Sequence, residues 1–265
     1  MSAFFEVGDV RLHYVQRGSG DDVVLLAGLG DAHDAWDAQI DAFSTRFRVT
    51  AIDNRGVGQS SLPDGEFTVA EMARDAAGLL DALGIASAHV AGFSMGGAIA
   101  QELALARPDL VRSLLLNGTW CKSDAFLIAT LRSICWQATV ADDARSFFES
   151  FLCWCYSPAV FADGRIEQFI VAGLEHPHPQ DGEAFLRTAR AIESHDTEAR
   201  LGAIAAPTLI IVGSDDILCP PRHSHALAAG IPGSRLIEVP DQAHQPFQED
   251  PVAFNAHALS FWDAL

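Results

Sequence analysis

The sequence predicts an α/β fold in which a mostly parallel sheet of eight strands carries helices on both faces. Apolar runs of strand length alternate with helical patterns over residues 1–119 and again over residues 202–265, and this alternation is typical of parallel sheets built from strand–helix–strand units. Residues 120–201 contain helical patterns and no convincing strand. We therefore expect a core formed by residues 1–119 and 202–265, with a helical cap of residues 120–201 inserted after the sixth strand.

Strands are expected where apolar residues alternate or form continuous runs. Residues 3–7 and 10–16 alternate on either side of the turn Gly8-Asp9, which is typical of a β-hairpin. The later runs are continuous, as in strands that are covered on both faces. These six strands are predicted at residues 23–27, 49–53, 89–93, 111–117, 207–213 and 234–239.

Helices are expected from apolar spacing and from capping signals. Residues Thr68 to Glu71 form a capping box that begins a helix, and this helix ends near Leu83 because Gly84 follows. Asp250-Pro251 caps a final helix that runs through Trp262. In the cap, helical patterns occur near residues 126–136 and 147–156 and over roughly 163–174 and 181–194.

Composition excludes several classes of partner. The chain of 265 residues has a formal net charge of −18 and a pI of about 4.7, so its surface repels nucleic acid and anionic lipid. No apolar run has the length of a membrane span, and the N-terminus lacks the basic start and apolar segment of a signal peptide. We expect a soluble, cytoplasmic monomer or homodimer whose partner is a small-molecule substrate.

The cysteines do not indicate a disulfide framework or a metal centre. There are five of them at irregular spacing, which is typical of a reducing compartment. No Cys or His partner follows Cys153 and Cys155 at the spacing of a zinc site. We predict neither a metal nor a cofactor.

Ser94 lies in the sequence Gly92-Phe93-Ser94-Met95-Gly96, between a predicted strand and a predicted helix. In that context the pattern G-x-S-x-G is typical of a nucleophile elbow. The elbow holds its serine in a strained conformation, so neighbours without side-chain bulk are needed on both sides. The alternative is a glycine-rich turn that contains a serine by chance, and residues elsewhere in the chain distinguish the two.

Partners for Ser94 are found after two later strands. Asp215 and Asp216 follow one strand, and His244 follows the last, and the carboxyl ends of strands are where reactive groups gather in open α/β sheets. An imidazole takes the serine proton, and a carboxylate orients the imidazole. Both aspartates are candidates for the second role. The oxyanion needs two N–H donors, which Met95 and Leu29 are placed to supply.

With these motifs the chain resembles the α/β-hydrolase superfamily over nearly its whole length. The resemblance rests on the elbow at residues 92–97, the turn at 53–60, the pattern Gly213-x-x-Asp216-x-x-x-Pro220, and His244 with residues 248–251 and Phe254 after it. It implies an α/β-hydrolase fold, favours Asp216 over Asp215 as the acid, and makes the cap the segment that shapes substrate choice.

The oxyanion loop departs from the usual family pattern at one position. A histidine usually precedes the glycine of this loop, and here that residue is Ala27, as in enol-lactonase-like and aminoacrylate-hydrolase-like members. The Leu29 donor is retained, but the residue that normally supports the loop is missing.

The predicted function is that of a metal-independent, cofactor-free serine hydrolase acting on a small carboxylic ester or lactone with an apolar body. Hydrolysis of a C–C bond in a β-diketone-like ring-cleavage product, or of an amide or carbamate, would use the same triad. Haloalkane dehalogenases and epoxide hydrolases are disfavoured, because they place Asp at the elbow. A ligand receptor without turnover is the alternative outside the enzymes, and it is disfavoured because all three triad residues are present.

Four residues are candidates for the wall of the substrate pocket. Phe93 precedes the serine, Trp120 lies just beyond a strand end, and Trp154 is an aromatic residue of the cap. His195 lies where the cap rejoins the core. Pockets of small-molecule enzymes are lined mainly by apolar and aromatic side chains.

Overall fold

The computed structural model describes residues 1–265, and its eight strands form one sheet in the order β1-β2-β4-β3-β5-β6-β7-β8. β2 pairs antiparallel with β1 and β4, whereas all the pairings from β4 to β8 are parallel. The predicted mostly parallel, eight-stranded sheet is therefore confirmed. The strands are β1 (Ser2–Val7), β2 (Val10–Gly18), β3 (Asp22–Leu26), β4 (Arg48–Ile52), β5 (Ala88–Phe93), β6 (Val111–Asn117), β7 (Thr208–Gly213) and β8 (Arg235–Val239).

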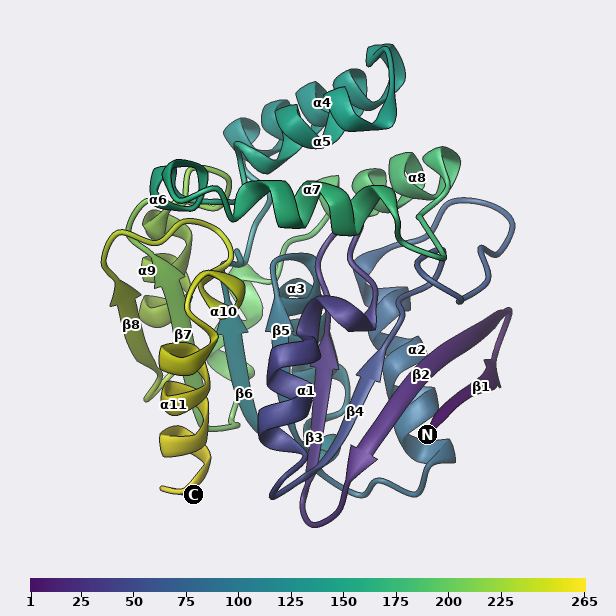
Figure 1. Cartoon of the computed structure of the whole chain (residues 1–265). Helices are drawn as coiled ribbons and strands as arrows, with labels where there is room; N and C mark the ends of the chain where they lie inside the picture. The colour runs from purple at the N-terminus through teal and green to yellow at the C-terminus, as the bar shows by residue number, and fades with distance from the viewer.

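Helices cover both faces of the sheet (Figure 1). On one face lie α1 (Asp37–Phe43) and α11 (Pro251–Trp262), together with the short helices η1 (His33–Trp36) and α10 (Pro246–Glu249). On the other lie α2 (Val69–Ala82), α3 (Met95–Ala106) and α9 (Pro221–Gly230). Two further short helices, η2 (Pro108–Leu110) and η3 (Glu198–Ala203), precede β6 and β7.

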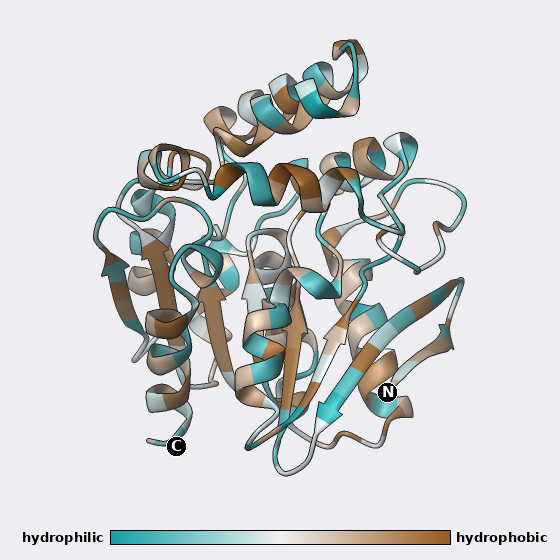
Figure 2. Ribbon diagram, viewed as in Figure 1, coloured by the Kyte–Doolittle hydropathy of each residue, from teal (hydrophilic) through white to brown (hydrophobic).

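The central strands contribute to two separate cores. In β3, Val24 and Leu26 pack against the α2–α3 side, and Val23 and Leu25 pack against the α1–α11 side. This double burial explains the unbroken apolar runs, which Figure 2 shows as brown central strands. Each such side chain contributes roughly 1.5–3 kcal/mol by leaving water.

The predicted capping box at the start of α2 is confirmed. The Thr68 side chain accepts a hydrogen bond from the Glu71 N–H (3.2 Å), and the Glu71 carboxylate accepts one from the Thr68 N–H (2.8 Å). Gly84, with φ of +67°, follows the end of the helix. A cap of this kind contributes about 1 kcal/mol to stability.

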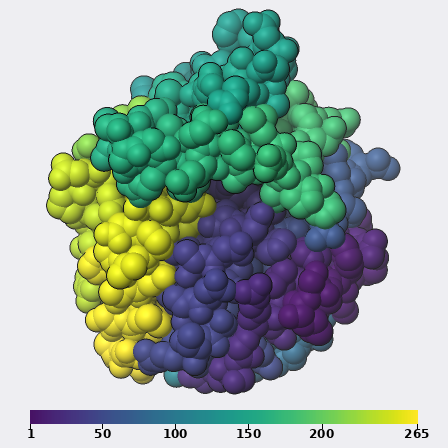
Figure 3. Space-filling view, viewed as in Figure 1, coloured from purple at the N-terminus to yellow at the C-terminus, as the bar shows by residue number.

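Five helices between β6 and β7, called the cap helices below, lie over the carboxyl ends of the strands (Figure 1). In the space-filling view they form a layer over that end of the core, with a recess at the seam (Figure 3). They are α4 (Ala125–Val140), α5 (Ala144–Leu152), α6 (Pro158–Ala162), α7 (Ile166–Leu174) and α8 (Gly182–Glu193).

The helical pattern near residues 147–156 does not continue as one helix. α5 ends at Leu152, and α6 begins with Pro158. Proline restricts the residue before it to extended backbone, so a helix cannot run through Ser157 into Pro158. The intervening turn brings Cys155 toward the core, as described below.

The chain enters and leaves the cap helices side by side. Lys122 and Asp196 form an isolated β-bridge, the Thr197 N–H donates to the Cys121 carbonyl (2.7 Å), and the Ser123 N–H donates to the His195 carbonyl (3.0 Å). None of the helices in the structure is both long and apolar enough to cross a membrane.

Candidate active site

Ser94 lies in the sharp turn between β5 and α3, with φ of 53° and ψ of −118°. A positive φ is strained for a residue with a side chain. A Cβ on Gly92 would lie 2.3 Å from the Gly96 carbonyl oxygen, and a Cβ on Gly96 would lie 2.0 Å from that of Leu26. Only glycine fits at both positions, so the turn requires the two glycines of the sequence pattern.

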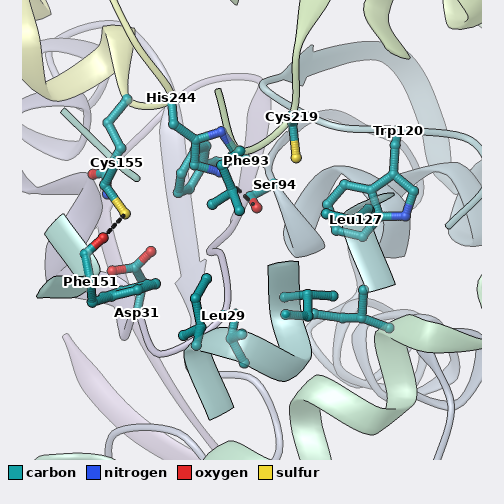
Figure 4. Close-up of a pocket in the computed structure, with 15 residues that line it drawn as sticks. Leu29, Asp31, Phe93, Ser94, Trp120, Leu127, Phe151, Cys155, Cys219 and His244 are labelled. Atoms are coloured by element: carbon teal, nitrogen blue, oxygen red, sulfur yellow. Dashed lines mark hydrogen bonds between the residues drawn. The ribbon is translucent and has the colours of Figure 1, made fainter. Parts of the chain in front are cut away.

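Ser94, His244 and Asp216 form a continuous hydrogen-bonded chain. Nε2 of His244 lies 3.0 Å from Ser94 Oγ, and its Nδ1 lies 2.7 Å from Asp216 Oδ2 (Figure 4 shows the first contact). All three side chains are buried. This geometry allows His244 to accept the serine proton while Asp216 fixes the ring tautomer.

The loop after β7 distinguishes the two aspartates. The other oxygen of Asp216 accepts hydrogen bonds from the N–H groups of Leu218 (3.0 Å) and Cys219 (2.7 Å), which orient the carboxylate. Asp215 is exposed and its carboxylate accepts a hydrogen bond from Ser214 (2.9 Å). Asp216 alone contacts His244.

Hydrogen bonds join the turn between α5 and α6 to the chain around His244 and to α10. The His244 N–H donates to the Cys155 carbonyl (3.1 Å). The Glu249 carboxylate accepts from the N–H groups of Ala243 (2.9 Å) and Ser157 (3.2 Å). These contacts were not predicted from the sequence. A backbone carbonyl leaves no sequence pattern, and Glu249 was noted only as part of the motif after His244.

Two backbone N–H groups beside Ser94 are free to bind an oxyanion. Met95 is the first residue of α3, where the N–H has no carbonyl partner in its own helix. The N–H of Leu29 makes no hydrogen bond within the chain, and Leu29 and Ser94 line the same pocket. The Asn54 side chain donates to the Ala27 carbonyl (3.1 Å). This bond supports the loop that has Ala27 in place of the usual histidine.

The pocket above Ser94 is small and mostly apolar, since 11 of its 15 lining residues are hydrophobic. Trp120, Leu127 and Cys219 lie on one side of Ser94, whereas Asp31 and Cys155 lie on the other (Figure 4). A substrate bound here therefore meets mainly apolar carbon on one side of the serine, and on the other side the polar groups of Asp31 and Cys155 next to Phe151.

Asp31 is the one ionisable carboxyl group on the pocket wall. It is half-buried and has no hydrogen-bond partner in the protein. Burial raises its pKa to about 7, with the charge of Asp34 acting in the same direction and His244 opposing. Burial also raises the pKa of the Cys155 and Cys219 thiols well above the ordinary value, so both are neutral.

Comparison with known proteins identifies the family. The family model described as the alpha/beta hydrolase fold matches residues 22–181. A protein of Azorhizobium caulinodans named "Putative carbamate hydrolase RutD" is 34% identical over 260 residues, which are 96% of each chain. The chain belongs to the α/β-hydrolase family.

Solved structures agree with this assignment. The enol-lactonase from Burkholderia xenovorans LB400 matches this hydrolase with a TM-score of 0.89 and 26% identity, over 98% of this chain and 100% of that one. A thermophilic esterase from Thermogutta terrifontis matches with a TM-score of 0.86 and 26% identity, over 100% of this chain and 98% of that one.

The structure brings two of the four predicted pocket residues of this hydrolase to the pocket wall. Phe93 and Trp120 line it, and Trp154 and His195 do not. His195 lies behind Trp120, with ring planes at 90° and centroids 6.3 Å apart, and burial lowers its pKa to about 4. Asp31 was not predicted as a pocket residue, although it lies only two residues after Leu29, the predicted oxyanion donor.

Asp53 joins the oxyanion loop to the sheet. One carboxylate oxygen lies 2.7 Å from Nδ1 of His33, and the other lies 2.8 Å from Nδ1 of His13. The backbone N–H groups of His33 and Gln59 also donate to it (2.7 and 3.1 Å). Ligand atoms of Asp53 and the two histidines lie within 4.8 Å of one another, which is close enough to hold a metal ion. The carboxylate is already fully used by these four hydrogen bonds, so we interpret the cluster as a structural anchor.

The pair formed by His33 and Asp53 makes stability depend on pH. The hydrogen bond to Asp53 is the main cause that raises the pKa of His33 above 6.5. Burial works to raise the pKa of Asp53, but hydrogen bonds from His33 and Gln59 outweigh it and hold the pKa below 3.8. The contribution of His33 to the free energy of unfolding is complete below pH 6.5 and is lost as pH rises through its raised pKa in the folded protein. The contribution of Asp53 is instead lost as pH falls through its lowered pKa.

Replacement of His33 by Gln should therefore lower the melting temperature more at pH 5.5 than at pH 8.5. Differential scanning fluorimetry measures the difference in melting temperature between His33→Gln and the wild type at each pH. His178→Gln, at an exposed position, is the control. An equal fall in melting temperature at the two pH values would show that the charged pair does not form.

Proposed function

We propose that this hydrolase cleaves small carboxylic esters or lactones with an apolar body through an acyl-enzyme on Ser94. The observation that carries the proposal is the chain of contacts from Ser94 through His244 to Asp216, with distances of 3.0 and 2.7 Å, at the base of an apolar pocket. A serine hydroxyl is a weak nucleophile until an adjacent base takes its proton.

The proposed reaction has two halves. Ser94 Oγ attacks the acyl carbon as His244 Nε2 takes its proton, and the N–H groups of Leu29 and Met95 bind the oxyanion. His244 then gives the proton to the departing alcohol oxygen. In the second half, His244 activates water, which attacks the acyl carbon, and Ser94 leaves with its proton restored.

The pocket supports a small, mainly apolar substrate. Its lining includes Trp120, Leu127 and Leu131, and no lysine or arginine is among the lining residues. The matched solved structures of an enol-lactonase and an esterase support cleavage of an ester bond.

Carbamate hydrolysis is a second candidate for the same machinery. It is favoured by the name of the relative that is 34% identical to this chain. The same pocket also offers the Asp31 carboxyl group, which can accept a hydrogen bond from a carbamate N–H.

Labelling with a fluorophosphonate tests the proposed nucleophile. Intact-mass spectrometry should find one adduct on the wild-type chain and none on Ser94→Ala. Because the reagent needs an activated serine rather than the natural substrate, the result does not depend on the choice of ester. An adduct that persists in Ser94→Ala, or none on the wild type, would rule out the proposal.

The bond type is tested with a substrate panel. p-Nitrophenyl esters of increasing acyl length, a γ-lactone and a phenyl carbamate are compared by kcat/KM. We expect turnover of the short-chain esters and the lactone, because the pocket above Ser94 is small and lined mainly by apolar side chains. Turnover of the carbamate alone would select the second candidate.

A further inference from the structure

We infer that Asp31 is a specificity-determining residue, which favours substrates with an N–H or O–H donor near the scissile carbonyl and disfavours substrates with a carboxylate there. The inference rests on the proposed function, because it concerns the substrates that Ser94 would attack.

The position of the carboxyl group is the first argument. Asp31 lies on the pocket wall with Ser94 and His244, on the side opposite Trp120 and Leu127 (Figure 4). Its Oδ2 lies close over the backbone of the oxyanion loop, since a Cβ on Gly28 would be only 2.9 Å away from it. The carboxyl group is therefore next to the segment whose Leu29 N–H is proposed to bind the oxyanion.

The absence of a protein partner is the second argument. A half-buried carboxyl group normally has a donor or a cation beside it. Asp31 has neither, because no hydrogen bond reaches its side chain and the pocket has no lysine or arginine. A donor on the bound substrate would satisfy it.

The charged and titratable groups around Asp31 come from three segments. Asp34 in η1 is a like charge, and His244 in the loop before α10 has the opposite effect. Cys155 and Tyr156, from the turn between α5 and α6, are neutral because burial raises their pKa values. No fixed cation offsets the charge on Asp31 once it ionises.

This electrostatic setting has opposite consequences for different substrates. An ionised Asp31 opposes the negative charge that develops on the substrate oxygen in the oxyanion loop, and it repels a second carboxylate directly. A like-charge pair at about 6 Å in partly buried surroundings corresponds to roughly a hundredfold in a binding constant. A donor group on the substrate would instead form a charge-assisted hydrogen bond.

Three methyl esters of nearly the same shape test the inference. Methyl succinamate ends in a carboxamide with two N–H donors, methyl levulinate ends in a methyl ketone with none, and monomethyl succinate ends in a carboxylate. Their kcat/KM values are measured at pH 8.5, where Asp31 is ionised, from methanol release. Their inhibition constants against p-nitrophenyl butyrate give the same ranking for any ester that turns over slowly.

In the wild type we expect methyl succinamate to exceed methyl levulinate by about tenfold, and monomethyl succinate to fall below methyl levulinate by about tenfold or more. Asp31→Asn should reduce the penalty on the carboxylate to within about threefold of the ketone, and Asp31→Leu should also remove the preference for the amide. The ketone serves as the reference within each variant, so a general loss of activity cancels. Asp37→Asn makes the same change at an exposed residue and should leave both ratios as in the wild type.

Two outcomes distinguish a failure of the proposed role of Asp31 from a failure of the proposed serine hydrolase function. Ser94-dependent turnover with the same ratios in wild type and both Asp31 variants would overturn the role of Asp31 and leave the serine hydrolase in place. No fluorophosphonate adduct on Ser94, together with no hydrolysis of p-nitrophenyl butyrate, would instead overturn the proposed function.

Discussion

Replacement of Asp216 by Asn is expected to lower kcat about 10⁴-fold while the protein stays folded. The carboxylate accepts a hydrogen bond from His244 Nδ1 at 2.7 Å, and this contact keeps the ring in the tautomer whose Nε2 can take the serine proton. An amide at the same place stabilises the wrong tautomer and cannot offset the charge of the imidazolium that forms. The loss of about 10⁴ is the size seen when a triad aspartate becomes asparagine in serine proteases.

Asp215→Asn is the matched control, because it makes the same change one residue away. Its side chain is exposed and faces Ser214 rather than His244, so its kcat should stay within about twofold of the wild type. Stopped-flow or steady-state rates with p-nitrophenyl butyrate measure both variants, and thermal melting checks that each is folded. A large loss in Asp215→Asn with little change in Asp216→Asn would transfer the orienting role to Asp215.

The order of strands and helices could be predicted from the sequence because each local pattern has one physical interpretation. The unbroken apolar run from Val23 to Leu26 is needed by a strand with a core on each face, and both cores are present. The elbow could be predicted for a similar reason. Gly92 and Gly96 are required by backbone atoms 2.3 and 2.0 Å from where their Cβ atoms would lie, so the steric need appears directly in the sequence.

The pocket was less predictable because it depends on where side chains point after the cap helices have packed. Trp154 and His195 are in segments that pass near the pocket, but His195 is turned into the protein behind Trp120. Asp31 faces the opposite way, into the pocket. A local pattern does not encode this difference, because the loop after β3 and the turn between α5 and α6 meet only in the folded chain.

The support of the oxyanion loop could be predicted only in part from the sequence. Ala27 identifies the missing histidine in the sequence, but the group that supports the loop instead lies 27 residues further along, in the Asn54 side chain. Asp53, next to it, holds His33 on the other side of the same loop. The turn after β4 therefore anchors both ends of the loop, which a motif match alone would not show.

Gly96→Ala should destabilise the fold by about 3 kcal/mol or more and remove most of the activity. A Cβ at this position would lie 2.0 Å from the Leu26 carbonyl oxygen and 2.7 Å from that of Ala27. Both atoms belong to the backbone, so relief requires α3 to move away from β3 rather than a side chain to rotate. Because Ser94 is two residues before Gly96 and Leu29 is two residues after Ala27, the same movement separates the nucleophile from its oxyanion donors.

The expected fall in Tm follows from the size of the chain. For a domain somewhat larger than 200 residues, 3 kcal/mol corresponds to a fall of roughly 6–12 °C in Tm. Gly182→Ala is the control, because Gly182 is the first residue of α8 and a Cβ there meets no atom within 4 Å. That variant should melt within about 2 °C of the wild type or slightly above it, since alanine favours the helix. A Gly96→Ala protein that melts and reacts like the wild type would mean that α3 does not approach β3 this closely, and the requirement for glycine after the nucleophile would then have to come from the turn itself.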